Sequence, residues 1–577
     1  MKKHLFLLIA SLLLCNYVFS QNMNAIEPEL QMVLDEKDNE MIRVNIILKS
    51  QINVNKLRKT TDNIDDLDIR REVVISELKD FSKQTQKDII SILEAGEKNG
   101  EVKDIVSHWV SNTITCTANK DYIRLLSNHQ DVDLIGYNEK QFLLWDEKGT
   151  VVEPQRGTTP SIKHVKANRV WELGYTGKGV LVAILDTGVN KHADIVNNLW
   201  DGGDEYPNHG YNTYENSHDV SDGFGHGTHC AGIICGDGTS GTETGIAPDA
   251  TIMCIKVMDN SGSGTPEGIC SGIEFALEHG AHVMNMSLGF TNAPKTTREM
   301  LRNAYISALE ANVAIITAVG NDGMFQISCA VPNNVRVPGG CPPPWIHPDQ
   351  QENAGGISAC IAVGAVDDKN NVAPFSSYGP FSWQNTSFKD YQYNGSTKPG
   401  LIRPDVCAPG CEITSCDPYN NSGYVKMDGT SQAAPCVTGV VCLMLEKHRK
   451  LTPAMICETL ESTAKKLSET KSNYTGSGCV DALNAINNIE ENDDTTSIVK
   501  INYDKEIKLY PNPADDMLNV KIDEIIKEIN IYNITGVKVY NTNSDVNNID
   551  VSDFNRGVYF VKIKTADREI VRQFVKK

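Results

Sequence analysis

The chain has 577 residues, of which 40% are hydrophobic and 22% are charged, and its formal net charge at pH 7 is −20. This length exceeds what one hydrophobic core supports, and at roughly 150 residues per domain it predicts about three or four folding units. The composition is that of a soluble globular protein and excludes a disordered or fibrous chain. Because no basic patch offsets the acidic balance, nucleic acid is excluded as a partner.

The first twenty residues predict a signal peptide, residues 1–20. Lys2 and Lys3 precede an apolar run at 5–14, and small residues follow near Ser20. The run is shorter than the about 20 residues that a membrane-spanning helix needs, and no later segment is long enough. Leu14, before Cys15, is not the small residue that precedes a lipidated cysteine. We therefore expect export and no transmembrane segment.

Sixteen cysteines are present, fourteen of them between positions 230 and 479. Export favours disulfides where cysteines lie in loop-like sequence. No pair has the CxxC spacing of a zinc site, and others lie in apolar runs that are typical of buried thiols. We expect a mixture: disulfides among Cys329, Cys341, Cys407, Cys411 and Cys416, and free thiols at Cys254, Cys436 and Cys442.

Residues 21–148 are expected to form a small α+β unit. An alternating strand (MIRVNIILK) is followed by a helical stretch at 66–93 and a second strand, SNTITCTAN. A short helix and the strand-like VDLIGYN complete it.

Residues 149–489 alternate apolar strands with helical stretches, which predicts an α/β domain with a mostly parallel sheet flanked by helices. The strands are VLVAILD, TIMCIKVM, HVMNMSL, VAIITAVG and CIAVGAV. Two long loops, 322–356 and 381–400, are of a length that is usually functional or mobile, and their role stays open.

The acidic, polar stretch that begins at residue 490 predicts a linker over 490–503. Residues 504–577 then alternate in short strand-like runs separated by turn residues. That pattern predicts a β-sandwich.

Three segments each place a reactive side chain beside glycines, which leave it sterically open. Asp186 ends a buried strand in AILDTG, His226 leads into a helix in GHGTHCAG, and Ser431 starts another helix in GTSQAAP. Alone, Asp186 is typical of a cap or turn residue and Ser431 of an N-cap. Together they compose a nucleophilic triad, and the helix N-terminus at Ser431 favours the negative charge that develops at an attacked carbonyl.

His226 and His229 also form an HxxH pair, which raises the alternative of a metal site. The metallopeptidase helix needs HExxH, and Gly227 stands where that glutamate would be. We expect no zinc, and a buried structural role for His229.

The three segments resemble the motifs DTG, HGTHxAG and GTSxAxP of the subtilisin-like (S8) protease family, in that chain order. The resemblance covers roughly residues 160–487 and implies a serine endopeptidase of the EC 3.4.21 class. It implies that Ser431 is the nucleophile, that His226 takes and returns a proton, and that Asp186 holds the imidazolium. An acyl-enzyme intermediate is implied, and no cofactor is required for the chemistry.

Further positions match the family. Asn321 in VGNDG resembles its oxyanion residue, against the simpler interpretation of a turn asparagine. SLG and SGSG resemble the two extended segments that clamp a peptide as an added strand, which leaves side-chain specificity open. The implied substrate-binding residues are Ser287, Leu288, Gly289, Gly262, Ser263 and Gly264.

Two positions depart from the family or fit it poorly. Gln432 stands where the family commonly has Met, beside the nucleophile but outside the proton relay, so we predict retained activity and lower sensitivity to peroxide. Structural calcium is common in the family, and Asp194 with the loop 237–243 falls near positions used there. Gly and Thr dominate that loop, so a ligand loop and a solvated turn both stay open.

The flanking segments carry resemblances of their own. The element order of 21–148 resembles the family's inhibitor propeptides, which implies a self-inhibited precursor cleaved between about 137 and 161. YPNP at 510–513, ITG at 534–536, GVY at 557–559 and the basic end resemble the type A sorting domain of the Bacteroidetes type IX secretion system. That implies passage across an outer membrane to the cell surface or the medium, against the alternative of a sandwich that binds carbohydrate or protein.

Two other classes of protein stay as alternatives. The complete triad and Asn321 oppose a scaffold protein that has lost activity, and the lack of a GxSxG elbow opposes an esterase or lipase. The expected partners are protein or peptide substrates, the chain's own propeptide as inhibitor, and the secretion machinery.

Overall fold

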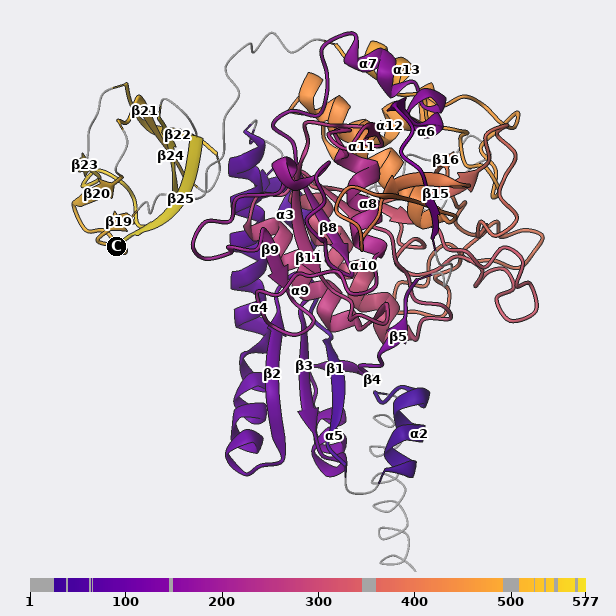
Figure 1. Cartoon of the computed structure of the whole chain (residues 1–577). Helices are drawn as coiled ribbons and strands as arrows, with labels where there is room; N and C mark the ends of the chain where they lie inside the picture. Colours follow the sequence, from indigo (N-terminus) through magenta and orange to yellow (C-terminus); the bar gives the residue numbers. More distant parts are fainter. Residues whose placement is uncertain are drawn as a thin grey trace, which may run out of the picture.

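The computed structural model (Figure 1) describes residues 25–37, 40–61, 64, 66–144, 149–344, 360–490, 508–522, 525–533, 536–543, 548–565 and 569–577. The expected signal peptide, the expected linker beyond Glu490, and Ile534 and Thr535 of the ITG motif lie outside these residues. None of the described helices combines the length and the apolar character that a bilayer crossing requires.

The N-terminal unit is an α+β fold, as the sequence predicts. Its antiparallel sheet has the order β2-β3-β1-β4, and its apolar core is its own. Helix α4 begins where it does because the Asp66 side chain accepts hydrogen bonds from the backbone amides of Asp68 and Ile69. The elements are β1 (Ile42–Leu48), β2 (Val102–His108), β3 (Thr113–Ala118), β4 (Val132–Tyr137), α2 (Pro28–Glu36), α3 (Val54–Thr61), α4 (Leu67–Lys98) and α5 (Lys120–Ser127).

The central domain is built on a seven-stranded parallel sheet of order β16-β15-β14-β13-β8-β11-β9. The fold class expected from alternating strands and helices is therefore confirmed. The strands are β8 (Leu181–Asp186), β9 (Gly210–Asn212), β11 (Thr251–Lys256), β13 (Val283–Met286), β14 (Ala314–Ala318), β15 (Cys360–Val366) and β16 (Val406–Pro409). The main helices are α8 (His226–Cys235), α9 (Pro266–Glu278), α10 (Lys295–Glu310) and α11 (Thr430–Lys447).

Both faces of this sheet are buried. In β8, Val182 and Ile184 pack into one cluster with α8 and α11, whereas the alternate residues Leu181, Ala183 and Leu185 pack into a second cluster with α9 and α10. This period of two explains why the strands are apolar throughout. Shorter elements complete the domain and its entry: α6 (Pro160–His164), α7 (Ala167–Trp171), η1 (Val196–Asn198), α12 (Pro453–Thr463), α13 (Ala482–Asn488), β5 (Gln141–Phe142), β6 (Thr150–Val152), β7 (Gly157–Thr158), β10 (Thr242–Glu243), β12 (Ser263–Gly264), β17 (Ile413–Cys416) and β18 (Tyr424–Met427).

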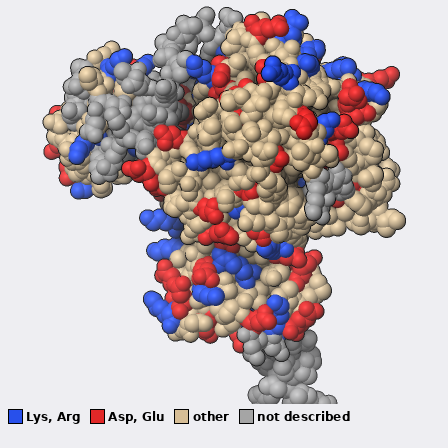
Figure 2. Space-filling view, viewed as in Figure 1, with Lys and Arg blue, Asp and Glu red and all other residues tan. Residues whose placement is uncertain are grey.

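The N-terminal unit lies against α9 and α10, below the central domain in the view of Figure 1. Glu27 accepts hydrogen bonds from the Thr296 backbone amide (3.1 Å) and hydroxyl (2.7 Å), and so satisfies an amide in the first turn of α10. Arg43 binds Glu267 in the first turn of α9. Figure 2 shows acidic and basic side chains intermingled over this unit, without a basic patch on the face in view. Further ion pairs across the interface join Arg58 to Glu310 and Lys79 to Glu278.

The long loop 381–400 is anchored to the domain through buried residues in its first half. Trp383 is buried, and its indole donates to the Gly340 carbonyl in the other long loop. The guanidinium of Arg302, on α10, lies over the Trp383 ring and forms an ion pair with Asp390. These contacts fix the loop against α10.

The expected disulfides are not formed. The fourteen cysteines whose side chains are described are all free thiols, and all but Cys411 are buried. The segments around Cys407 and Cys416 have loop-like sequence, but these residues lie in strands β16 and β17, and burial raises the pKa of their thiols. The free thiols expected at Cys254, Cys436 and Cys442 are confirmed.

The C-terminal strands form two sheets, of order β19-β20-β23 and β22-β21-β24-β25, around one apolar core. Tyr559 and Val561 of β24 point into that core, and Phe560 between them packs instead against Ile69 and Val73 of α4. The strands are β19 (Lys508–Tyr510), β20 (Met517–Lys521), β21 (Glu528–Asn533), β22 (Lys538–Thr542), β23 (Asn548–Asp550), β24 (Gly557–Lys564) and β25 (Glu569–Lys576).

Candidate active site

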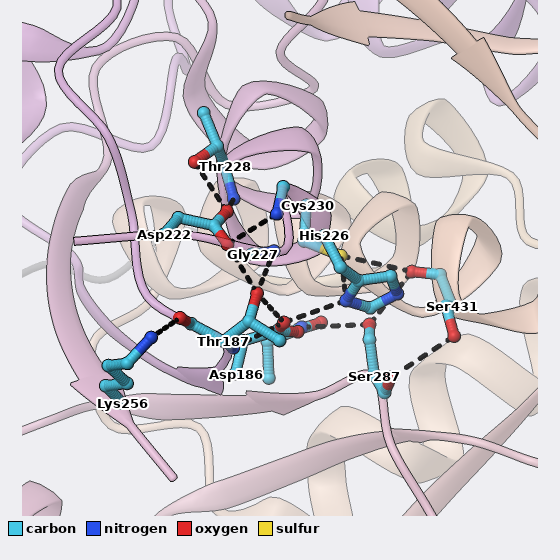
Figure 3. A network of polar contacts seen from close by, with 12 residues as sticks. Asp186, Thr187, Asp222, His226, Gly227, Thr228, Cys230, Lys256, Ser287 and Ser431 are labelled. Atoms are coloured by element: carbon cyan, nitrogen blue, oxygen red, sulfur yellow. Dashed lines mark hydrogen bonds and ion pairs between the residues drawn. The ribbon is translucent and has the colours of Figure 1, made fainter. Parts of the chain in front are cut away.

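The three sequence motifs converge at the carboxyl edge of the parallel sheet (Figure 3). Asp186 is the last residue of β8, His226 the first of α8 and Ser431 the second of α11. Close approach of α8 to β8 requires glycine at position 227, because a Cβ there would lie 2.1 Å from the Gly188 carbonyl oxygen. Gly227, directly after the histidine, therefore lets helix and strand approach each other.

Asp186 and His226 form a buried ion pair. The His226 Nδ1 atom lies 2.8 Å from Asp186 Oδ1, and the two residues are 5% and 0% exposed. Burial alone lowers the pKa of His226, but the Asp186 carboxylate outweighs it and raises this pKa well above the usual value. The pair leaves Nε2 as the free nitrogen of the ring, and in the described part of the chain this buried atom has no hydrogen-bond partner.

Ser431 is poised beside this ring without yet bonding to it. Its Oγ donates to the Ser287 carbonyl oxygen at 3.1 Å, and the Ser287 hydroxyl in turn donates to the Ser431 carbonyl at 2.9 Å. Catalytic hydrogen bonds are often incomplete before substrate binds. A rotation of the serine side chain is therefore needed to direct Oγ to the imidazole.

A second buried carboxylate, Asp222, organises the loop behind the pair, and the sequence reasoning missed it. Its oxygens accept from the Gly225 amide (2.6 Å), the Thr228 amide (2.8 Å) and the Thr187 hydroxyl (2.8 Å). These donors include an amide at the start of α8, where negative charge is favoured. An acid four residues before the histidine, in DGFGHGT, was the available signal.

Lys256 was also missed. This buried lysine at the end of β11 donates to the Thr187 carbonyl and, at 2.9 Å, to the Ser221 carbonyl. A single lysine at the end of an apolar strand does not by itself predict a buried cation, because its acceptors come from other segments.

Asn321 lies where the sequence predicts, after β14 and beside the start of α11. Its Oδ1 accepts hydrogen bonds from the Thr430 amide and hydroxyl, both at 2.9 Å. This fixes the amide orientation and leaves Nδ2 without a hydrogen-bond acceptor among the described residues, next to Ser431. The arrangement offers one preorganised donor for an oxyanion.

His229 has the structural role that the sequence predicts. Its Nε2 lies 3.1 Å from the Ile413 carbonyl and 3.2 Å from the Val425 carbonyl, and burial lowers its pKa to about 3. The ring is therefore neutral, and its Nε2 is held by backbone carbonyls.

Asp194, the calcium candidate, is held by protein hydrogen-bond donors. Its Oδ1 accepts from the Ser240 amide and its Oδ2 from the Tyr424 hydroxyl, each at 2.6 Å. Nearby, the Asp237 carboxylate accepts from the Thr239 amide within its own turn. Calcium requires six to eight oxygen ligands, and the oxygens here are held by protein donors.

The two predicted clamp segments enclose the chain's own residues 141–144. Ser263 and Gly264 pair antiparallel with Phe142 and Gln141. The Leu143 amide donates to the Gly262 carbonyl (3.0 Å), and the Gly289 amide donates to the Leu143 carbonyl (3.1 Å). Leu288 is buried in the core beneath.

On the other side of Ser431, the chain re-enters as β6, which pairs antiparallel with β18. Between the strands and the triad lies a cavity of about 600 Å³. Its lining includes His226, Ser431 and Gln432, and the Gln432 Oε1 atom is buried without a partner among the described residues. Residues 141–144 thus lie between the clamp segments, whereas Gly149 and Val151 line the cavity beside the triad.

Comparisons with known proteins agree with this geometry. Residues 177–478 match the family model of the subtilase family, and residues 508–577 match that of a secretion system C-terminal sorting domain. The chain is 32% identical over 400 residues to alkaline protease of Alkalihalobacillus alcalophilus, which covers 69% of this chain and 88% of that protein. It is 34% identical over 321 residues to subtilisin Savinase of Lederbergia lenta, covering 56% and 96% respectively.

The chain therefore belongs to the subtilase family, and it is a serine endopeptidase with a C-terminal secretion-sorting domain. The sorting domain marks it for export to the cell surface or the medium.

Proposed function

We propose that the chain is an exported precursor of an endopeptidase that hydrolyses peptide bonds in proteins through Asp186, His226 and Ser431. One observation carries the proposal: three segments distant in sequence bring an ion-paired imidazole and a serine hydroxyl to one cavity, at the end of a cleft already filled by a peptide strand.

In the proposed mechanism the His226 Nε2 atom takes the proton of Ser431 Oγ as that oxygen attacks the substrate carbonyl carbon. The carbonyl oxygen becomes an oxyanion that accepts from Asn321 Nδ2 at the N-terminus of α11. The imidazolium, held by Asp186, then protonates the leaving amine, and the C–N bond breaks to give an ester on Ser431. Water then attacks the ester carbonyl carbon as His226 Nε2 takes its proton. The imidazolium returns that proton to Ser431 Oγ, and the carboxylic acid is released.

The N-terminal unit is proposed to be an inhibitory propeptide. Residues 141–144 hydrogen-bond between the two clamp segments as a substrate would, and so exclude other chains. Acidic side chains of α9 and α10 accept from the unit's backbone and bind its basic residues. These contacts support a tight intramolecular inhibitor.

The processing site is proposed to lie between Leu144 and Gly149, within the wider expected range of about 137–161. The support is that residues 141–144 bind between the clamp segments, whereas residues 150–152 pair with β18 beside the cavity that Ser431 lines. Cleavage there would separate the propeptide from the peptidase domain, and the sorting domain would be removed or retained at the cell surface after export.

Peptide mapping of secreted protein from wild type and Ser431→Ala tests the proposal. Wild type should lose the N-terminal unit, digest casein and react with a fluorophosphonate probe at Ser431. The Ser431→Ala variant should keep the unit and show neither activity nor labelling. A matured wild-type protein that neither labels nor cleaves casein would favour the scaffold alternative.

A further inference from the structure

A buried arginine from the long loop 322–356 reaches the strand that fills the cleft. The Arg336 Nη1 atom lies 3.1 Å from the Leu144 carbonyl oxygen and 3.4 Å from the Leu143 carbonyl oxygen. Nothing in the sequence motifs marks this residue, and the catalytic steps do not use it.

The ion pair of Arg336 leaves that nitrogen free for the cleft. Nε and Nη2 bind the two oxygens of Asp322 side-on, at 2.6 and 3.0 Å. A purely structural pair would be complete with these two bonds. Among the described residues, the remaining Nη1 has acceptors only on residues 143 and 144, which belong to the bound strand and not to the peptidase domain.

The segments at Gly289 and Gly320, on the two sides of the cleft, pack closely against the Arg336 side chain. A Cβ on Gly289, in the clamp segment, would lie 2.7 Å from Arg336 Cβ, and one on Gly320, before Asn321, would lie 2.8 Å from Arg336 Cγ. The Arg336 amide donates to the Val319 carbonyl, and Val337 bridges to Phe290. The guanidinium therefore has a fixed position between the clamp segment and the oxyanion segment.

We propose that Arg336 is a substrate-binding residue of the mature enzyme, which holds the main-chain carbonyl oxygens of an extended polypeptide just before the bond to be cleaved. This inference rests on the proposed function of the cleft. Since the contacts are to main-chain atoms and Asp322 balances the charge, Arg336 adds affinity for polypeptides in general and no preference for acidic side chains. The substrate class it favours is an extended peptide over a small ester.

The test compares processed wild type, Arg336→Met and Arg336→Lys on an internally quenched decapeptide and on p-nitrophenyl acetate, which has no carbonyl besides the reacting one. Fluorophosphonate labelling of Ser431 counts active sites. A hydrogen bond from a charged donor predicts an about 10- to 100-fold rise in KM for the decapeptide in Arg336→Met, with a smaller change in kcat. Arg336→Lys should lie between it and wild type, and the rate with the ester should stay within about twofold in all three.

Arg302→Met is the matched control. Arg302 is also a buried arginine with two hydrogen bonds to one aspartate, Asp390, in this case end-on through Nη1 and Nη2, but it packs on Trp383 and has no hydrogen bond to residues 141–144 among the described contacts. Its KM for the decapeptide should equal that of wild type.

An unchanged decapeptide KM in Arg336→Met, or in Arg336→Lys should the methionine variant fail to fold, overturns the inference. Equal losses on peptide and ester would also overturn it, because they indicate a structural role. Failure of wild type itself to label or to cleave the peptide would instead reject the proposed function.

Discussion

Asp186 and Asp194 are two fully buried aspartates on the same stretch of chain. Their hydrogen bonds indicate different roles. Each oxygen of Asp194 has a partner, since Oδ1 accepts from a backbone amide and Oδ2 from the Tyr424 hydroxyl. Asp186 shares Oδ1 with His226 and the Thr187 amide, and its Oδ2 has no partner among the described residues. Asp194 therefore holds a loop in place, whereas Asp186 keeps negative charge available to stabilise an imidazolium.

The difference lies in the partner rather than in the aspartate. A tyrosine hydroxyl whose pKa is raised by burial does not give up its proton near neutral pH, so Asp194 meets a fixed donor. The imidazole of His226 instead gains and loses a proton in the proposed mechanism, so Asp186 acts on the imidazolium that forms. Substitutions at the two sites should therefore change different measured quantities.

The largest expected effect is that of Asp186→Asn. We expect kcat/KM to fall by about 10⁴-fold, because the imidazolium loses its counter-charge and the ring its fixed orientation. Only the neutral ring accepts the serine proton, so activity rises with pH through the His226 pKa, which Asp186 raises. The acid limb of the residual activity should therefore move to lower pH in Asp186→Asn.

A pH profile of kcat/KM measures this shift, and Asp194→Asn is the control that should keep the wild-type acid limb. An acid limb at the same pH in wild type and Asp186→Asn would show that Asp186 does not set the pKa of His226.

Asp222→Ala should have the next largest effect. It removes the acceptor of two amides and two hydroxyls around the start of α8. Bonds to a charged acceptor contribute about 1.5–3 kcal/mol each, so we expect the free energy of unfolding to fall by at least about 2 kcal/mol. Urea unfolding of the inactive Ser431→Ala precursor measures this without self-digestion. A loss below about 0.5 kcal/mol would contradict the assigned role.

Tyr424→Phe sharpens the comparison at the second aspartate. It leaves Asp194 Oδ2 and the Thr242 amide, which donates to the same hydroxyl at 3.1 Å, without partners. A buried unsatisfied polar group costs about 1–3 kcal/mol, which we expect as a loss of unfolding free energy with kcat/KM nearly unchanged per active site. Thermal unfolding of Tyr424→Phe in the Ser431→Ala background measures the loss of stability. Peptide kinetics of the active Tyr424→Phe enzyme measure kcat/KM. A variant that loses activity but no stability would reverse the roles assigned to the two aspartates.

The sequence predicted the residues at strand and helix ends, where motif and local structure coincide. Asp186, His226, Ser431 and Asn321 all lie at such ends, so glycine-rich motifs and apolar strands sufficed to find them. Hydrophobic periodicity alone also predicted the strand at 42–48 and the long helix that begins at residue 67.

The residues that were missed act across the fold. Tyr424 and Arg336 reach Asp194 and the cleft from segments whose packing no local pattern encodes. The expectation of disulfides was wrong for a related reason. Export and cysteine number favour pairing, but Cys407 and Cys416 lie in strands, where they are buried as free thiols. Long-range contacts thus decide what composition leaves open.

The smallest expected effect is that of calcium. Because each oxygen of Asp194 already accepts a protein hydrogen bond, a cation at this site would compete with the Ser240 amide and the Tyr424 hydroxyl for the same carboxylate charge. The thermal midpoint of the Ser431→Ala precursor should therefore be the same within about 1 °C in millimolar calcium and in excess EDTA, since a bound ligand in excess would raise it by mass action. Tyr424→Phe provides the contrast, as its Asp194 has a free oxygen. A clear rise of the wild-type midpoint with calcium that Asp194→Asn abolishes would show that the ion competes with these donors, and that the two buried aspartates differ less than their hydrogen bonds indicate.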